Sequence, residues 1–392
     1  MVQSDGGGRR FRRVLSNRLA TCGLIVVLVA ATATAMKSDA GPGTGLGVRG
    51  ADISFTLQGE AIGQTHSVSG QVMPLEVLLA AHGATHVRVR VWVNPAEGIS
   101  DLQSALILAR RAAAAGMKIV VDLHYSDTWA DRVSQTPPQA WAGLTPDQLG
   151  SQVETYTRDV MTAFAAQGTP ADIVQIGNEI NNGFLWPAGA IYGPDGQRWQ
   201  EFSDLLRAGI RGATPEGPDP TPTIMIHVDT GGDVEASIYF FDRLRDFGVE
   251  FDIIGLSYYP FWNGSLSKLS ANLTALADRY GKDILVAETA YPWTLESADG
   301  PTVVSDISSL PDAGLYPPTP AGQGDYYLAL AEVLRNVPGG KGAGFLVWEP
   351  GWLPGVSATP ELGNTHNNLT LFDWSGNALP AAFTAFHPGN GD

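Results

Sequence analysis

The sequence has 392 residues, 44% of them hydrophobic and 9% aromatic, a composition typical of a soluble globular protein with one large α/β barrel or two ordinary domains. Its 24 Lys and Arg residues are outnumbered by 40 Asp and Glu residues, which gives a formal net charge of −16 at pH 7. Such a negative surface repels nucleic acid and acidic polysaccharides, so the charge excludes these partners and favours a neutral substrate.

Residues 1–36 have the pattern of an export signal. Five arginines precede the short apolar stretch 23–35 (GLIVVLVAATATA), which ends in the small residues expected at a cleavage site. At roughly 13 residues this stretch is short for a membrane span, which needs about 20. We therefore expect a secreted protein, with membrane association only in the alternative case of an uncleaved anchor. The single cysteine, Cys22, lies within the signal, so the cleaved chain would have no disulfide, thiolate nucleophile or cysteine-based metal site.

Strand and helix signals alternate after a flexible, Gly-rich lead-in at residues 37–49. Apolar runs predict strands at residues 51–55, 86–92, 118–123, 173–177, 223–227, 251–256, 283–287 and 343–348. Helical periodicity predicts helices at residues 73–81, 101–115, 146–166, 199–210, 234–247, 266–280 and 322–336, with a partial helix in the tail.

This alternation predicts a (β/α)₈ TIM barrel that forms a single catalytic domain over residues 50–388. A doubly wound sheet is the alternative fold. No Gly-rich phosphate loop follows the first predicted strand, which argues against a nucleotide-binding version of that sheet. Long segments follow the predicted strands at residues 178–197, 257–265, 288–321 and 349–370. In a barrel these segments would all lie on the catalytic face.

Two predicted strands end in a glutamate. The stretch 171–182 (ADIVQIGNEINN) ends in Asn178-Glu179 and further amides, which are costly to place beside a buried strand unless they are used. Taken alone, it is equally compatible with Glu179 in a solvated turn. The stretch 283–291 (DILVAETAY) delivers Glu288 in the same way. Two strand-end carboxyls are what a glycosidase needs, one to protonate the leaving oxygen and one to attack the anomeric carbon or activate water.

The second predicted strand carries two inward-facing arginines. In the sequence HVRVRVW, the period of two places Arg88, Arg90 and Trp92 on one face and the valines on the face that packs against helices. A buried arginine requires a carboxylate, for which Asp52 and the strand-end glutamates are candidates. We expect one arginine to form a structural ion pair and Arg90, nearer the strand's end, to hold the pKa of the attacking carboxylate low.

Other polar and aromatic residues near the predicted strand ends are candidates for binding sugars. Aromatic rings stack on the apolar faces of sugars, while amides, imidazoles and carboxylates bind hydroxyls. Beside Asn178 and Arg90, the predicted substrate-binding residues are Trp92, His124, Asp127, Trp186, His227, Tyr258, Trp262 and Trp348. For a histidine such as His124, a supporting role is the alternative interpretation. Glu349 is a third strand-end acid and a rival for a catalytic role.

Seven ordered segments resemble the endo-β-1,4-galactanases of glycoside hydrolase family 53. They are GADISF (50–55), THVRVRVWVNP (85–95), VDLHYSDTWAD (121–131), VQIGNEINNGFLWP (174–187), IGLSYYPFW (254–262), VAETAYPWT (286–294) and WEPGW (348–352). The resemblance implies a (β/α)₈ barrel of a retaining clan that acts on galactan, with Glu179 as acid/base and Glu288 as nucleophile. Retention requires the two carboxyl groups to lie about 5–5.5 Å apart.

The same resemblance bears on metals and partners. Some bacterial members of the family bind calcium in their last long loops, and residues 361–373 (ELGNTHNNLTLFD) resemble that region in part without a matching ligand set. We predict that no cofactor or catalytic metal is required and that the protein is a monomer. Two alternatives stay open: a related retaining β-glycanase acting on another neutral polysaccharide, and a non-catalytic carbohydrate-binding barrel.

Overall fold

The computed structural model describes residues 45–96, 98–214, 221–357 and 363–387. The predicted signal at 1–36, and the predicted lead-in as far as residue 44, lie outside these ranges. Within them, no helix is both long and apolar enough to cross a bilayer.

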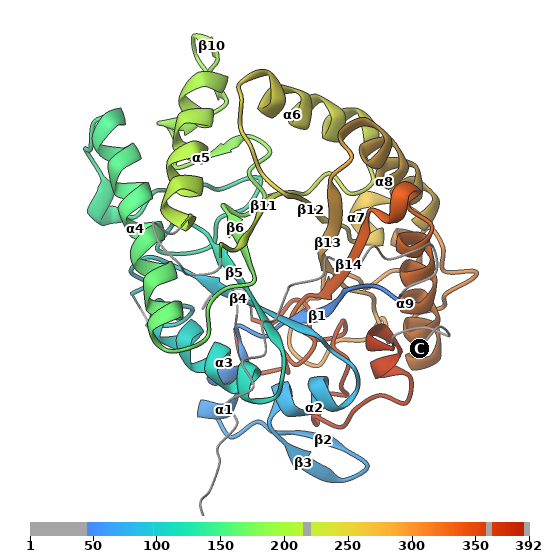
Figure 1. Ribbon diagram of the computed structural model, residues 1–392. Helices are drawn as coiled ribbons and strands as arrows, with labels where there is room; N and C mark the ends of the chain where they lie inside the picture. The colour runs from blue at the N-terminus through green and yellow to red at the C-terminus, as the bar shows by residue number, and fades with distance from the viewer. Residues whose placement is uncertain (1–44, 97, 215–220, 358–362, 388–392) are drawn as a thin grey trace, which may run out of the picture. The chain divides into compact units, whose positions relative to one another are not determined.

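Eight parallel strands close into a barrel (Figure 1). In chain order they are β1 (Val48–Asp52), β4 (His86–Val91), β5 (Lys118–Leu123), β6 (Ile173–Ile176), β11 (Thr223–Val228), β12 (Ile253–Ser257), β13 (Asp283–Thr289) and β14 (Gly342–Val347). The barrel closes because β1 pairs with both β14 and β4. The predicted (β/α)₈ fold is thus confirmed, and the doubly wound sheet is excluded.

The helices surround the barrel, as Figure 1 shows. They are α1 (Thr56–Ala61), α2 (Leu75–Ala81), α3 (Leu102–Ala114), α4 (Pro146–Ala166), α5 (Trp199–Ala213), α6 (Val234–Asp246), α7 (Pro260–Asn263), α8 (Leu266–Tyr280) and α9 (Pro320–Arg335), with short 3₁₀ turns between and after them. Local sequence sets their ends. The N-terminus of α4 is fixed by a capping box between Thr145 and Gln148. The C-terminus of α8 is closed by Gly281 in the left-handed conformation.

The N-terminal part of the barrel differs from its prediction. The first strand ends at Asp52, three residues before the predicted end, although Ile53 and Phe55 continue an apolar alternation. The chain turns there because the Asp52 carboxylate accepts a hydrogen bond from the Ser54 backbone nitrogen at 3.0 Å. Helix α1 and the hairpin of β2 (His66–Val68) and β3 (Gln71–Met73), which follow, were not predicted. Two further pairs of two-residue strands, β7–β8 (Gly183–Phe184 and Gly189–Ala190) and β9–β10 (Tyr192–Gly193 and Gly196–Gln197), were also missed where they interrupt a loop.

The inside of the barrel has an apolar lower part and a charged upper part. Side chains from seven of the strands form a closed apolar cluster: Val48, Val120, Ile173, Met225, Ile253, Leu285, Ala287 and Leu346. Towards the C-terminal strand ends, the buried side chains are charged or polar, including Asp52, Arg88 and Asp122. On β4 the valines pack outward into the core beneath the helices, as the period of two predicted. The alternation therefore delivers two cations into the barrel.

We predict that Gly344→Ala strongly destabilises the fold. Gly344 lies in β14 with φ at 144°, and a Cβ atom there would overlap the Val48 carbonyl oxygen of the neighbouring strand. Relief requires the β1–β14 pairing to shift, so we expect the unfolding free energy to fall by about 3 kcal/mol or more. Gly116→Ala is the matched control: its φ is 86°, but a Cβ would meet open space. Its loss should be only about 1–2 kcal/mol. Chemical denaturation measures both, and equal losses would contradict the steric argument.

Candidate active site

Glu179 lies just past the end of β6, on a left-handed turn. Its φ is 48°, which follows Gly177 at 80°, and its side chain is half-buried. The Ser257 hydroxyl donates to Glu179 Oε1 at 2.7 Å. Burial, then the negative charge of Glu288 and that of Asp229, raise the pKa of Glu179 to about 8. A carboxyl in this environment holds a proton at neutral pH.

Glu288 lies near the end of β13 and contacts a cation directly. Its carboxylate Oε1 lies 2.9 Å from Arg88 Nη2, and Oε2 accepts a hydrogen bond from the Tyr259 hydroxyl at 3.0 Å. Burial, together with the charges of Asp122 and Asp52, raises the pKa of Glu288, and the Arg88 guanidinium and the Tyr259 hydroxyl oppose part of this rise. No cation contacts Glu179 among the described residues. A proton shared by the two coupled carboxyls therefore belongs on Glu179, which leaves Glu288 ionised.

Arg88 is the centre of the buried charge network. Its guanidinium pairs with Asp52 of β1 at 2.9 Å and Asp122 of β5 at 2.8 Å, in addition to Glu288. It also donates to Gln175 Oε1 at 3.1 Å and Asn178 Oδ1 at 2.8 Å. The side chain is 1% exposed. One guanidinium thus joins groups from four strands at the level of the two glutamates.

The prediction that Arg90 would hold the attacking carboxylate was wrong in its geometry. Arg90 pairs with Glu349 at 3.5 Å, and its guanidinium lies over the rings of Phe55 at 4.8 Å and Trp129 at 4.4 Å. Arg88 contacts Glu288 instead, because its long side chain reaches from its own layer towards the strand ends. Position along the strand therefore did not decide which arginine meets the nucleophile candidate.

Glu349 is surrounded differently from the glutamate pair. It is 3% exposed, its Oε2 accepts from the Phe55 backbone nitrogen at 3.2 Å, and its Oε1 faces Arg90. Burial and the charge of Asp52 raise the pKa of Glu349 well above its ordinary value. Both oxygens are engaged by the protein, and no contact with Glu288 or Glu179 is formed in the described structure. This geometry does not support Glu349 as one of the two catalytic carboxyls.

Three of the predicted sugar-binding residues are buried and bonded within the protein. His124 is 2% exposed, with Nε2 at 2.9 Å from Asp122 and Nδ1 at 3.2 Å from the indole nitrogen of Trp92. Trp92 itself is 4% exposed, and His227 is completely buried. Both ring nitrogens of His124 are thus occupied, as the supporting interpretation of this residue expected. Direct sugar binding by these three residues does not fit the structure.

Tyr258 is corrected in the same way. It is completely buried in the core beneath the helices, and its hydroxyl donates to the Gly264 carbonyl at 2.7 Å. The side chains that face the barrel are those of its neighbours Ser257 and Tyr259, which contact Glu179 and Glu288 respectively. Both were missed. The period of two along β12 and its extension would have found them, because residues 255, 257 and 259 share a face.

The remaining predicted residues lie around the catalytic face. Asn178 is 6% exposed and bonds through both side-chain atoms, with Nδ2 donating to the Ala130 carbonyl at 2.9 Å. Trp262 is 58% exposed beside Tyr259, with the ring centroids 5.2 Å apart. Trp348 is half-buried and packs near Trp129 at 6.4 Å. Trp262 and Trp348 therefore keep ring surface that a sugar could contact.

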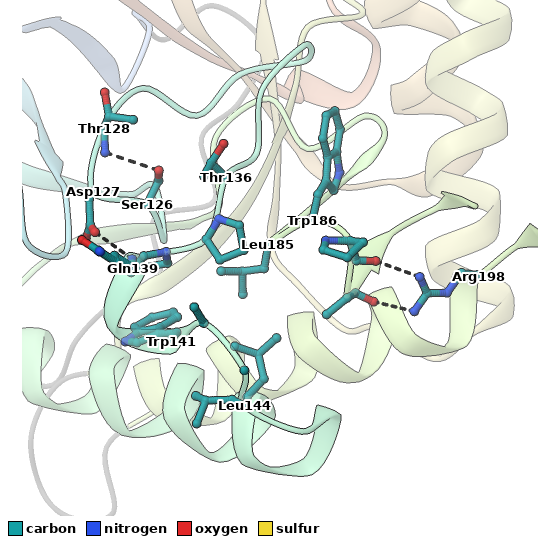
Figure 2. Close-up of a pocket in the computed structure, with 17 residues that line it drawn as sticks. Ser126, Asp127, Thr128, Thr136, Gln139, Trp141, Leu144, Leu185, Trp186 and Arg198 are labelled. Atoms are coloured by element: carbon teal, nitrogen blue, oxygen red, sulfur yellow. Dashed lines mark hydrogen bonds between the residues drawn. The ribbon is translucent and has the colours of Figure 1, made fainter. Parts of the chain in front are cut away.

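Trp186 and Asp127 line a separate cavity of about 730 Å³ (Figure 2). Its walls come from the segments after β5 and β6 and include Trp141, Leu144 and Leu185, and neither Glu179 nor Glu288 reaches it. The Asp127 carboxylate accepts from the backbone nitrogens of residues 94 and 139, while Arg198 donates to the carbonyls of residues 187 and 188. These polar groups are used to hold the two loops. Because neither glutamate lines this cavity, it is not the site of the glutamate pair.

The described residues do not fit a calcium site. In these ranges no group of three or more His, Cys, Asp or Glu side chains could hold a metal ion. The segment predicted to resemble a calcium region begins outside them, at residues 361 and 362. Its described part bonds to the loop after β13 through neutral groups. The Asn367 side-chain amide donates to the Ser297 hydroxyl at 2.9 Å, and the Thr302 hydroxyl donates to the Thr365 carbonyl at 2.9 Å. Calcium prefers six to eight oxygen ligands including carboxylates.

Comparison with known proteins identifies relatives over nearly all of the described chain. The model of "Glycosyl hydrolase family 53" matches residues 48–386. A probable arabinogalactan endo-β-1,4-galactanase A of Aspergillus fumigatus is 39% identical over 346 residues, covering 86% of this chain and 92% of the relative. The structure of the Ignisphaera aggregans GH53 catalytic domain superposes with a TM-score of 0.80 at 34% identity, covering 86% of this chain and 95% of that one. A structure from a study of two fungal β-1,4-galactanases gives a TM-score of 0.76 at 33% identity, covering 87% and 99%.

We predict that Arg88→Met destabilises the protein in a pH-dependent manner. The variant leaves Asp52, Asp122 and Glu288 without their shared cation, so the unfolding free energy at pH 7 should fall by about 3–5 kcal/mol. Without the Arg88 charge, burial would hold the folded-state pKa values of Asp52 and Glu288 above their unfolded values. The penalty is therefore largest at high pH and shrinks as the pH falls from 8 to 5 and the carboxyls take up protons.

Arg90→Met is the matched control on the same face of β4. Arg90 pairs with Glu349, whose raised pKa lets it stay neutral without a cation. The fall in unfolding free energy caused by Arg90→Met should therefore change much less with pH. Urea denaturation across this pH range measures both variants, and parallel pH dependences would contradict the role assigned to Arg88.

Proposed function

The chain belongs to glycosyl hydrolase family 53, and we propose that it is an endo-β-1,4-galactanase that cleaves β-1,4-galactan side chains of arabinogalactan and pectin with retention of configuration. The observation that carries the proposal is the contrast between two strand-end glutamates: Arg88 contacts Glu288, whereas burial keeps Glu179 protonated. The name of the Aspergillus relative, which matches over most of both chains, supports the choice of galactan.

The first step joins the substrate to Glu288. Glu179, with a pKa raised to about 8, gives its proton to the leaving glycosidic oxygen. The ionised Glu288 attacks the anomeric carbon from the opposite side, the glycosidic bond breaks, and a covalent glycosyl-enzyme forms. Arg88 and Tyr259, each bonded to one oxygen of Glu288, orient the nucleophile and favour its charged form.

The second step reverses the role of Glu179. It is now a carboxylate, and it takes a proton from a water molecule that attacks the same carbon. Glu288 leaves, so two inversions give net retention. The requirement that one group act first as acid and then as base suits a pKa near the working pH, which burial and the neighbouring negative charges provide.

The surroundings of the pair are suited to a neutral glycan. The net charge of −16 disfavours anionic chains, and the exposed ring of Trp262 beside Tyr259 offers an apolar platform for a sugar. We further propose that residues 1–36 direct secretion, that the mature enzyme is a monomer, and that it requires no cofactor.

The substrate is tested by comparing polysaccharides. We expect the purified protein to release reducing sugar from β-1,4-galactan at least roughly 100-fold faster than from cellulose, mannan or xylan, because a site built to bind one set of hydroxyls rejects others. Faster release from one of the other three would replace galactan with that substrate. No release from any of them, with retained galactan binding, would favour a non-catalytic barrel.

The two glutamates are distinguished by their dependence on the leaving group. Glu179→Ala should lose about 10²–10⁴-fold in kcat/KM on galactan, but little on an aryl galactoside with an acidic phenol, which leaves without protonation. Glu288→Ala should lose activity on both substrates, and azide or formate should partly restore aryl galactoside cleavage. Glu349→Gln is the control and should keep the wild-type ratio between the two substrates. Equal losses on both substrates in Glu179→Ala would contradict its role as the acid.

A further inference from the structure

One hydrogen bond orients the carboxyl group of Glu179. Among the described residues, only Ser257 bonds to that carboxyl, and it contacts Oε1 at 2.7 Å. Ser257 in turn lies 3.0 Å from Nε2 of His227, on the neighbouring strand β11. We propose that His227 and Ser257 are positioning residues that keep Oε1 as an acceptor and so direct the acidic proton of Glu179 to Oε2. The inference rests on the proposed function, because it assigns the acid's proton to one atom.

The backbone of Glu179 fixes the tautomer of His227. The Glu179 peptide N–H points at His227 Nδ1, with a nitrogen–nitrogen distance of 3.4 Å. A peptide N–H can only donate, so Nδ1 must accept and cannot carry a hydrogen. His227 is completely buried, and burial, together with the charge of Arg88, lowers its pKa well below the ordinary value. A neutral imidazole has one N–H, which therefore lies on Nε2.

The other neighbour of Nδ1 is compatible with this tautomer. Asn178 Oδ1 lies 2.9 Å from Nδ1 and would suit an Nδ1–H donor. That oxygen already accepts a charge-assisted hydrogen bond from the Arg88 guanidinium at 2.8 Å. It therefore needs no hydrogen from the imidazole. Gln175 Nε2 also lies 3.1 Å from Nδ1, but its two hydrogens have nearer acceptors in Asp122 Oδ1 at 2.7 Å and the Gly177 carbonyl at 3.0 Å, so the Glu179 peptide N–H is the donor that decides.

The direction of the chain follows from this one hydrogen. His227 Nε2–H donates to Ser257 Oγ, so the single hydroxyl hydrogen of Ser257 is directed to Glu179 Oε1. Ser257 is 1% exposed and His227 is completely buried, so the pair is shielded from bulk water. When Glu179 is protonated, Oε1 is already an acceptor, and the proton takes Oε2. When Glu179 is ionised for the second step, the same hydroxyl stabilises the carboxylate.

Other charged groups also act on Glu179, but none of them sets the position of its proton. Glu288, Asp229 and Asp131 raise its pKa through space, while Arg132 pairs with Asp229 at 3.3 Å. In the described ranges none of these four hydrogen-bonds to the Glu179 carboxyl, and none bonds to Oε2. Oε2 is thus left for the leaving group, whereas Oε1 is held by Ser257.

The kinetic test compares Ser257→Ala with Ser257→Thr. Loss of the hydroxyl should lower kcat/KM on galactan roughly tenfold and leave it within about twofold on an aryl galactoside with an acidic phenol. The basic limb of the pH profile should move to higher pH, because the carboxylate loses a donor. KM for galactan should change little, since Ser257 is buried and does not reach substrate.

Two variants separate positioning from packing. Ser257→Thr keeps the hydroxyl, so its kcat/KM on galactan and the basic limb of its pH profile should stay close to those of the wild type. Ser203→Ala removes a buried hydroxyl that has no partner in the described structure, and it should leave the kinetics of the wild type unchanged. If Ser257→Ala lost activity equally on both substrates with an unmoved basic limb, the positioning role would be overturned.

A second measurement needs no activity. In wild-type protein labelled with ¹⁵N-histidine, the His227 signals, assigned with a His227→Asn variant, should show a protonated Nε2 and an unprotonated Nδ1 from pH 5 to 9. A protonated Nδ1 would overturn the inference even if galactan is cleaved. Failure of the wild type to cleave galactan would instead count against the proposed function, and the nitrogen signals would still decide the direction of the chain.

Discussion

The buried guanidinium of Arg88 is the interaction on which the rest of the catalytic face depends. It is 1% exposed and contacts three carboxylates from β1, β5 and β13. Removing charges from water costs several kcal/mol per ion, so these carboxylates are tolerable in the barrel only because they share a cation. The sequence supplies that cation through alternation on β4, which sends the valines outward and the arginines inward. The charged layer, in turn, packs on the apolar cluster that fills the lower part of the barrel.

The same cation divides the work between the two glutamates. Glu288 touches it and Glu179 does not, so burial raises the pKa of both carboxyls but a contacting cation opposes it only at Glu288. Their mutual repulsion then disfavours a doubly ionised pair, and the proton that remains belongs on Glu179. An acid and a nucleophile can thus be made from the same residue type at equivalent strand ends. The difference lies in the neighbours that the barrel places beside each carboxyl.

Sequence patterns could predict the barrel and the strand-end positions, because both follow from periodicity. Eight apolar runs separated by helical periods gave the fold, and the period of two gave the inward face of β4. Contacts made by long side chains could not be predicted in this way, since Arg88 reaches past its own layer to Glu288. The choice of Tyr259 over Tyr258 was missed for another reason: the period of two was not extended past the predicted strand end at residue 256. His124 and Trp92 have the residue types of a sugar site, but they bond to each other.

Two of the glutamates at the strand ends share a strained backbone conformation but differ in the partners of their carboxyl groups. Glu179 and Glu349 both take left-handed conformations directly after a barrel strand or nearly so, with φ at 48° and 44°. Such conformations cost about 1–3 kcal/mol in a residue other than glycine, and the surrounding structure must hold them in place. The turn aims each carboxyl inward, but the two then meet different groups. Glu349 meets a peptide N–H and an arginine covered by aromatic rings, which occupy both of its oxygens. Among the described residues, Glu179 meets a single hydroxyl, which leaves its other oxygen without a hydrogen bond. The strained turn therefore presents a carboxyl, and only the free oxygen makes it available for chemistry.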